Sequence, residues 1–296
     1  MDKVTKLGVC ATAVLGLVLP RFLNATEVTT IFTAGPQKKE DASHVFFVDL
    51  ATIALAKSGG NYIIELSPYA GQGRTIELMA QNKTYDFLWS ASSTERYEKL
   101  LQVKFPLFKG GLGWRGSIIR NEFSGEFSRI RSIKELSKYV ACQGLHWPDA
   151  DILTHAGLAV QRMEKFDDMV KMLDSKRCDY LPLSLFEGRA ELALIQHRYP
   201  DLVFSTALIL HYPLVMNFYV RPDYPQLATD LLVGLKKMET ESRVLDYLKR
   251  HTLTKSAFPL SQFEDSTILD MENSEFTEHQ QLDNFALHAL GPTPHN

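Results

Sequence analysis

The part of the sequence best suited to chemistry is a serine- and threonine-rich turn that carries a single arginine. It covers residues 90–96 (Ser-Ala-Ser-Ser-Thr-Glu-Arg) and directly follows the apolar run 85–89. The hydroxyl and backbone N–H groups of such a turn can donate hydrogen bonds to a small anion, and a guanidinium can hold a carboxylate with two parallel hydrogen bonds. We therefore expect Ser90, Ser93 and Arg96 to bind a small carboxylate. The alternative is that Arg96 is an ordinary exposed arginine at the start of a helix.

A second group of polar side chains follows the preceding apolar run, residues 62–66. The group contains Tyr69, Gln72 and Arg74. Two glycines flank Gln72, which would let backbone N–H groups at a helix start approach an anion. The segment lacks the third glycine of a dinucleotide-binding loop. Arg74 either assists an anion site or is an exposed arginine in the first turn of the helix.

Aromatic residues provide candidate walls for a ligand pocket. Aromatic side chains commonly line the pockets of small organic ligands, but they also fill protein cores. We expect Trp114 and Trp147 to face a cleft and Trp89 to pack in the core. Asp149, two residues after Trp147, is interpreted as the cap of a helix.

Sequence signatures of catalysis and of metal binding are missing. The chain has no Gly-x-Ser-x-Gly, no Gly-x-x-x-x-Gly-Lys and no His-Glu-x-x-His motif, and its nine histidines show no ligand spacing. The formal net charge of -3, without a cluster of Lys and Arg, argues against nucleic acid as a partner. We expect a binding protein with no cofactor and no metal, rather than an enzyme.

Residues 1–25 have the pattern of a secretory signal peptide. Lys3 and Lys6 precede the apolar run 7–19, which is shorter than the ~20 residues that a membrane-spanning helix needs. We expect cleavage after Ala25 and a periplasmic mature chain; an uncleaved membrane anchor is the alternative. Cleavage would remove three basic residues and one acidic residue, which changes the formal net charge from -3 to -5.

The mature chain alternates apolar, β-branched runs with segments of helical periodicity, which predicts an α/β protein. Strand-helix-strand orders give parallel sheets with helices on their faces, and ligands gather where strand carboxyl ends meet helix N-termini. A chain of about 270 residues is long enough for two lobes. The expected elements of the first part are strands at 28–34, 62–66 and 85–89 and helices at 41–57 and 74–81. A glycine-dense crossing at 109–116 leads to a second alternation of strands and helices, up to about residue 204. Apolar strands at 203–210 and 214–220 and helices within 227–250 follow.

Cys142 and Cys178 are the only cysteines after residue 25. Export would permit a disulfide between them. However, Cys142 comes late in one expected strand and Cys178 comes just before another, and this offset along a sheet can exceed bridging distance. We favour free thiols, with a disulfide as the alternative.

Together these features resemble the amino-acid type (family 3) of extracytoplasmic solute-binding proteins, which have the two-lobed type 2 periplasmic-binding-protein fold. The resemblance covers residues 28–252, nearly the whole mature chain. Beyond the turn that ends at Arg96, it is carried by Gly-Leu-His-Trp-Pro-Asp at 144–149, Met-Leu-Asp-Ser-Lys-Arg-Cys-Asp-Tyr at 172–180, Tyr-Pro-Leu at 212–214 and Arg-Pro-Asp at 221–223.

The resemblance implies a site in which Ser93 and Arg96 hold the carboxylate of a small polar ligand, an amino acid or a related organic acid. In that family an acidic residue near the end of the strand after 177–179 holds the ligand's ammonium group. This chain has Ser184 at the corresponding place and Glu187 three residues later. Either Glu187 substitutes, or the ligand is not an α-amino acid.

The function implied by the resemblance is capture of the ligand by a monomer that delivers it to the membrane permease of an ABC transporter. One alternative is a sensor lobe that presents the ligand to a membrane signalling protein. The other is a dehydratase-like enzyme on the same fold, for which Glu187 is the candidate general acid.

The implied domains are two lobes, each a mixed, mostly parallel sheet flanked by helices. Lobe 1 covers 26–113 and 205–255, lobe 2 covers 114–204, and the hinge crossings lie near Gly113 and Ser205. Residues 256–296 are polar and acidic. Such a composition favours a weakly ordered tail, dispensable for binding, over the alternative of an interaction peptide around 285–287.

Overall fold

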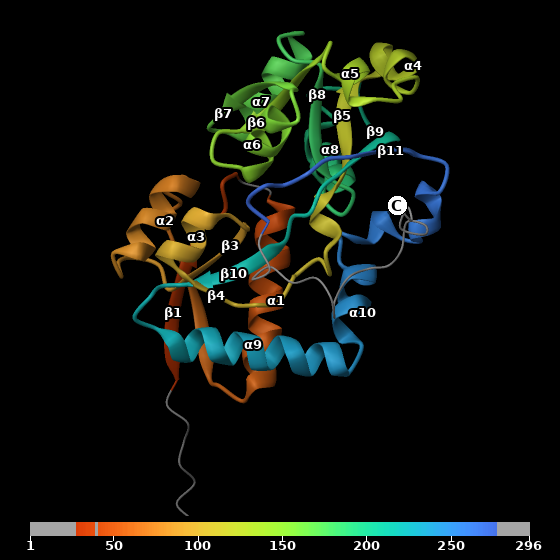
Figure 1. Cartoon of the computed structure of the whole chain (residues 1–296). Coiled ribbons are helices and arrows are strands. Elements are labelled where there is room, and N and C mark those ends of the chain that lie inside the picture. Colours follow the sequence, from red (N-terminus) through yellow and green to blue (C-terminus); the bar gives the residue numbers. More distant parts are fainter. Residues whose placement is uncertain (1–27, 39–40, 277–296) are drawn as a thin grey trace, which may run out of the picture.

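The computed structural model describes residues 28–38 and 41–276 of the chain. Within these residues the strands form a two-stranded, a three-stranded and a six-stranded sheet, each accompanied by helices. Figure 1 shows the two smaller sheets in the lower half of the molecule and the six-stranded sheet in the upper half. The signal peptide expected at 1–25 lies outside the described residues. No helix in the described ranges is long and apolar enough to cross a membrane.

The lower half is built from two separate stretches of the chain, residues 29–102 and 216–250. Its strands are β1 (Thr29–Ala34), β2 (Tyr62–Ser67), β3 (Phe87–Ala91), β4 (Leu101–Gln102) and β10 (Met216–Val220). β1 and β2 pair in parallel, from Thr29 opposite Tyr62 to Ala34 opposite Ser67, whereas β10 pairs antiparallel with both β3 and β4. Its helices are α1 (Ala42–Ser58), α2 (Gln72–Ala80), α3 (Thr94–Lys99), α9 (Pro225–Thr240) and α10 (Arg243–Arg250).

The upper half is a six-stranded mixed sheet in the order β11-β9-β5-β8-β6-β7. β5 is antiparallel to both of its neighbours, while β6 is parallel to β7 and β8. The strands are β5 (Trp114–Arg120), β6 (Val140–Gly144), β7 (Ala159–Met163), β8 (Tyr180–Ser184), β9 (Leu202–His211) and β11 (Thr267–Asp270), and the helices are α4 (Ser124–Phe127), α5 (Ile133–Leu136), α6 (Pro148–His155), α7 (Phe166–Asp174) and α8 (Gly188–Ile195).

Local sequence signals explain where the first helix begins and ends. The Asp41 carboxylate accepts a hydrogen bond from the backbone N–H of His44 at 3.0 Å and so caps α1, which ends at Gly59 in the left-handed region with φ 97°. α1 packs against α9 at a point where a Cβ on Gly234 would lie 1.8 Å from the carbonyl oxygen of Ala54. Only glycine permits this close approach of the two helices.

Two crossings connect the halves, and they contact each other. The first ends at Gly113, as expected, and the backbone N–H of Tyr212 in the second donates to the Gly113 carbonyl at 3.2 Å. A Cβ on Gly113 would lie 1.8 Å from the carbonyl oxygen of Tyr212. The expected second crossing near Ser205 is wrong, because Ser205 pairs with Ser117 inside the six-stranded sheet. The apolar strand continues to His211, so the second crossing is residues 212–215.

The segment after Thr254 is also corrected by the structure. Its described part, 255–276, is not a loose tail, because β11 pairs in parallel with β9 as an edge strand of the six-stranded sheet. Phe263, Leu269 and Met271 are buried in the main apolar core. These few apolar residues are spaced among polar ones, which gives the segment its polar composition. Phe285–Leu287, the core of the alternative interaction peptide, lies outside the described residues.

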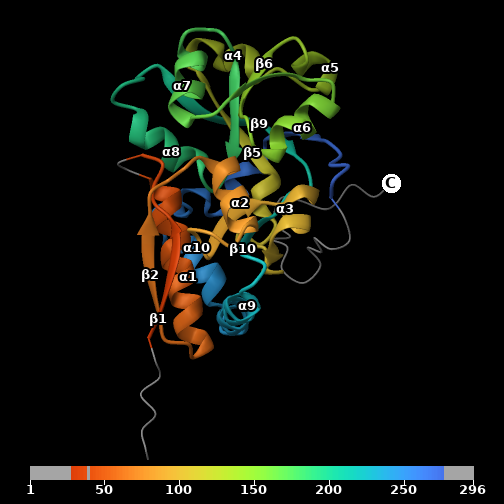
Figure 2. The same ribbon diagram turned by 90° about the vertical axis from the view of Figure 1, so that its left-hand side faces the viewer.

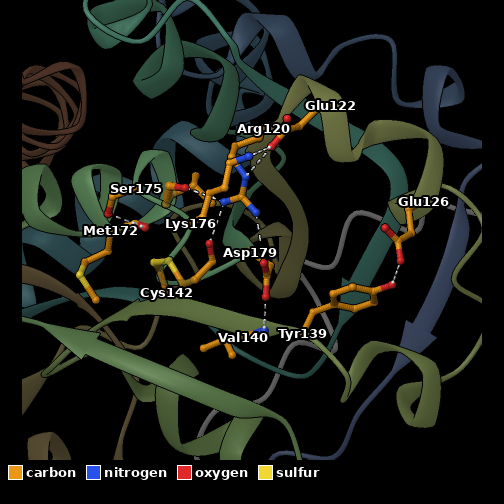
Figure 3. Close-up of polar contacts among 12 residues, drawn as sticks. Arg120, Glu122, Glu126, Tyr139, Val140, Cys142, Met172, Ser175, Lys176 and Asp179 are labelled. Atoms are coloured by element: carbon orange, nitrogen blue, oxygen red, sulfur yellow. Dashed lines mark hydrogen bonds and ion pairs between the residues drawn. A yellow bond between two sulfur atoms is a disulfide. The ribbon is translucent and has the colours of Figure 1, made fainter.

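Cys142 and Cys178 form a disulfide, with their Cα atoms 5.7 Å apart, which corrects the preference for free thiols. Cys178 comes just before β8, as expected, but it lies in a bend that departs from the line of the strand, so the expected offset along the sheet does not apply. Arg120 holds the bend, because it donates to the Cys178 carbonyl at 2.8 Å and to the Asp179 carboxylate at 3.1 Å. Figure 3 shows Arg120 directed towards Asp179. The other oxygen of that carboxylate accepts from the backbone N–H of Val140 at 2.9 Å.

Candidate functional site

A cavity of about 630 Å³ lies between the two halves. The lower half contributes the carboxyl ends of β1 and β3 and the N-termini of α1 and α2. The upper half contributes Arg115 on β5, Leu183 on β8 and the N-terminal residues of α6, α7 and α8. Strand ends and helix N-termini therefore meet here, as the sequence predicts for an α/β ligand site. The partial positive charges at the helix N-termini favour a bound anion.

The upper wall of the cavity contains a buried ionic network. Arg115 and Asp149 are 4 % and 2 % exposed, and Nη2 of Arg115 lies 2.6 Å from Oδ1 of Asp149. The hydroxyl of Tyr212, in the second crossing, donates to the same oxygen at 2.5 Å. Although burial disfavours its charged form, the carboxylate of Asp149 raises the pKa of Arg115 above its ordinary value. Asp149 is therefore an ion-pair partner, and the expectation that it caps its helix is wrong: the cap position belongs to Trp147.

Glu187 lines the cavity and has a carboxyl group with a shifted pKa. Its nearest cation is Arg115, whose Nη1 lies 3.8 Å from Oε2, and its side chain is 14 % exposed. Burial raises the pKa of Glu187 to about 7, and the attraction of Arg115 offsets this only in part. Near neutral pH the group can therefore accept or donate a proton.

This raised pKa predicts that stability depends on pH between about 4.5 and 7. The folded state holds the Glu187 proton more tightly than the unfolded state in this window, so the free energy of unfolding should fall as pH rises through it and level off above pH 7. Glu187→Gln, which mimics the neutral form, should make the protein more stable than wild type at pH 8, by up to about 2 kcal/mol. Urea unfolding of both proteins at pH 5 and pH 8 measures the effect. An equal pH dependence in the two proteins would contradict it.

Arg96 is buried, with 3 % exposure, so the alternative of an exposed surface arginine is wrong. Its guanidinium donates to the carbonyls of Ala91 at 2.5 Å and His146 at 2.8 Å, and contacts the Gln72 side-chain oxygen at 3.5 Å. No carboxylate in the described ranges forms an ion pair with it, and its Nε has no hydrogen-bond partner there. Burial lowers the pKa of Arg96. An unpaired buried cation of this kind is costly until an anion binds it.

Arg96 reaches the 630 Å³ cavity through its neighbours rather than lining it directly. Ala91 and Gln72, which accept its hydrogen bonds, both line that cavity. The side chain itself lines a second cavity of about 410 Å³ between α2, α3 and α6. Because it donates to His146 in the upper half, Arg96 also links the two halves.

The other polar residues named from the sequence fall into two groups. Tyr69, Gln72 and Ser90 line the larger cavity, and the Gln72 amide donates to the Ser90 hydroxyl at 3.4 Å. Burial, reinforced by Glu164, raises the pKa of Tyr69 to about 12, so its hydroxyl keeps its proton. Ser93 lines the smaller cavity and caps α3 by accepting from the Arg96 backbone N–H at 3.4 Å.

Among the remaining candidates, Trp147 faces the cleft as expected. It lines both cavities. Trp114 instead stacks on His211 with ring centroids 3.9 Å apart, beside the crossings, and lines neither cavity. Trp89, assigned to the core, stacks on Phe47 at 5.1 Å and also lines the larger cavity. Arg74 is exposed and lines neither cavity.

Several polar residues of the cavity have no local sequence signal. Glu191 on α8 accepts hydrogen bonds from Lys38 at 2.5 Å and Ser43 at 3.1 Å, which joins the halves on the side opposite Arg96. Arg115 and Asp149 are likewise paired across 34 residues of sequence. In each case the partners become neighbours only through the tertiary fold. Neither the composition of the sequence nor the spacing of its residues therefore identifies them as interacting pairs.

Comparison with known proteins gives matches in structure alone. The sequence matches no known protein family and none of the curated proteins. An amino-acid ABC transporter substrate-binding protein, AbpA from Streptococcus pneumoniae bound to L-arginine, has a TM-score of 0.57 and 12% identity, over 78% of this chain and 95% of that chain. A mutant of ArgBP from T. maritima has a TM-score of 0.52 and 18% identity, over 76% and 94%. A histidine kinase sensor domain with similarity to periplasmic binding proteins has a TM-score of 0.54 and 13% identity, over 77% and 96%.

These similarities establish the fold. The described chain is an α/β protein of the two-lobed, type 2 periplasmic-binding-protein kind, as the sequence predicts. At identities below 20% the likeness concerns the fold alone, and function must be argued from the site itself.

Proposed function

We propose that this chain is an extracytoplasmic solute-binding protein that encloses a small polar ligand with a carboxylate, an amino acid or a related organic acid. The observation that carries the proposal is the cavity of about 630 Å³ between two halves joined by two short crossings. Opening and closing of the halves about the crossings would admit and enclose the ligand. Solved structures with this fold include amino-acid-binding proteins, which supports the same ligand class.

Two charged groups give the ligand an orientation in this proposal. The carboxylate is bound through Arg96, the buried cation whose present acceptors are neutral carbonyl groups. The converging helix N-termini add to this attraction. A ligand ammonium group, if present, is bound by Glu187, and its positive charge would favour the ionised carboxylate. Aromatic side chains from both halves, Trp89 and Trp147, supply the apolar walls.

A thermal-shift screen tests the proposal. The purified chain is heated with each of the twenty amino acids and a panel of small carboxylic acids, with and without Arg96→Ala. A ligand that binds only the folded state stabilises it by mass action, so at least one compound should raise the melting temperature of wild type but not of the variant. The proposal fails if no compound raises it, or if the same compounds stabilise both proteins equally.

The second part of the proposal concerns location and partner. The chain is exported, and as a monomer it delivers the ligand to the permease of an ABC transporter. Expression of the full chain in a Gram-negative host should therefore give periplasmic protein that begins at Thr26, the residue after the expected cleavage point. Intact-mass analysis of the periplasmic fraction measures this. Protein that keeps Met1 and stays in the membrane fraction would contradict export by a cleaved signal peptide.

Two other functions share this fold. The matched histidine kinase sensor domain supports presentation of the ligand to a membrane signalling protein. Glu187, with its pKa raised to about 7, supports an enzyme that uses a general acid, and an ancestral amino-acid-binding precursor of cyclohexadienyl dehydratase is a further structural match, at a TM-score of 0.55. Turnover of a cyclic acid that depends on Glu187 would favour the enzyme. Stoichiometric binding without turnover would favour the binding protein.

A further inference from the structure

The last described residues pass from one half of the molecule to the other. β11 belongs to the six-stranded sheet of the upper half, and residues 271–276 continue from it. In Figures 1 and 2 the blue ribbon of this segment lies at the level where the halves meet. We call residues 271–276 the strap.

The strap is bound first to His211, at the end of β9, and to the second crossing that follows it. The backbone N–H of Met271 donates to the carbonyl of His211 at 2.8 Å, and the side-chain amide of Asn273 donates to the carbonyl of Pro213, also at 2.8 Å. Just before the strap, Oδ1 of Asp270 lies 2.7 Å from Nδ1 of His211. The chain that must bend when the halves separate is therefore held along one side by the strap.

The strap then reaches the lower half. Oε2 of Glu275 accepts a hydrogen bond at 3.3 Å from the backbone N–H of Thr94, the first residue of α3. This is the helix whose cap is Ser93 and whose buried side is Arg96. Residues 272–275 line the smaller cavity together with both of these residues and with α6 of the upper half. The strap thus borders the same junction that the hydrogen bond from Arg96 to His146 spans.

We propose that the strap restrains opening of the cleft. Separation of the halves would move α3 away from the upper half, while Met271 and Asn273 stay bound at the crossing. The hydrogen bond between Glu275 and Thr94 would then break. The free energy of opening therefore includes the loss of this hydrogen bond as well as the loss of direct contacts between the halves. The strap therefore shifts the ligand-free protein towards the closed arrangement and slows exchange of the cavity with solvent.

The test compares two double variants of the ligand-free chain. Asn273→Ala/Glu275→Ala removes the side-chain contacts of the strap to Pro213 and Thr94 and keeps the backbone hydrogen bond of Met271. The matched control Glu272→Ala/Ser274→Ala changes two exposed side chains of the same segment. Amide hydrogen exchange reports on the Thr94 N–H and on α3, and small-angle X-ray scattering reports on the separation of the halves. We expect exchange at least about fivefold faster in 94–99 and a larger radius of gyration for the first variant alone.

Equal exchange and equal radius in the two variants would overturn the proposal. If the first variant does not fold, Asn273→Ala alone is measured against Ser274→Ala by the same two methods. The experiment uses no ligand, so its outcome is independent of the proposed function. A chain that binds no solute can still show the restraint, and a chain that binds a solute can lack it.

Discussion

Replacing Arg96 by alanine is expected to weaken binding of the ligand at least about 100-fold, or about 2.7 kcal/mol. The reason is that the ion pair between the Arg96 guanidinium and the ligand carboxylate is buried. Without the guanidinium, the charge of the carboxylate is left unpaired inside a closed cavity. The measurement is isothermal titration of wild type and variant with the compound that gives the largest thermal shift.

Two further variants make this result specific. Arg96→Lys should restore only part of the affinity, because an ammonium group cannot make two parallel hydrogen bonds to one carboxylate. Arg74→Ala removes an exposed arginine of the neighbouring helix and is the matched control, with affinity close to wild type. Equal affinity of wild type, Arg96→Ala and Arg96→Lys would show that Arg96 only holds the halves together through its carbonyl contacts.

Truncation after Thr254 is expected to destabilise the protein severely. It removes the edge strand β11 and the buried side chains of Phe263, Leu269 and Met271. Loss of one buried Phe, Leu or Met side chain costs about 2–5 kcal/mol. For a chain of this size each kcal/mol lowers the melting temperature by about 2–4 °C, so a fall of more than about 10 °C is expected. Differential scanning calorimetry measures it.

Truncation after Phe276 is the matched control for this experiment. It removes residues 277–296 and keeps the contacts that residues 255–276 make with the rest of the described chain. If both truncated chains melted at the temperature of wild type, the packing of β11 and Phe263 would contribute nothing to stability, contrary to this account.

The sequence predicts the elements well because their signals are local. The strands β1, β2 and β3 and the helices between them lie within two residues of the expected bounds. Polar residues also interrupt the apolar patterns at the ends of these strands, and Tyr69, Gln72 and Ser90, predicted from this pattern, line the cavity between the halves. Ser93 caps the short helix that contains Arg96, so their common location follows from the sequence as well.

The errors come from contacts that have no local pattern. An apolar strand gives no sign of the residue at which it leaves a sheet, so the sequence places the second crossing near Ser205, whereas the structure has it at 212–215. The segment 255–276 buries single apolar residues between polar ones, so its average composition conceals β11. The disulfide depends on the bend at Cys178, and the role of Asp149 depends on Arg115, which only the tertiary fold brings near.

The most direct test of the central claim is a crystal structure of the chain with the compound that gives the largest thermal shift. We predict that this compound lies in the 630 Å³ cavity, in contact with both halves, and that its carboxylate reaches the Arg96 guanidinium past Gln72 and Ala91, the cavity-lining residues that Arg96 contacts in this structure. A compound bound on the surface, or in contact with only one half, would contradict the claim that the two halves form the binding site.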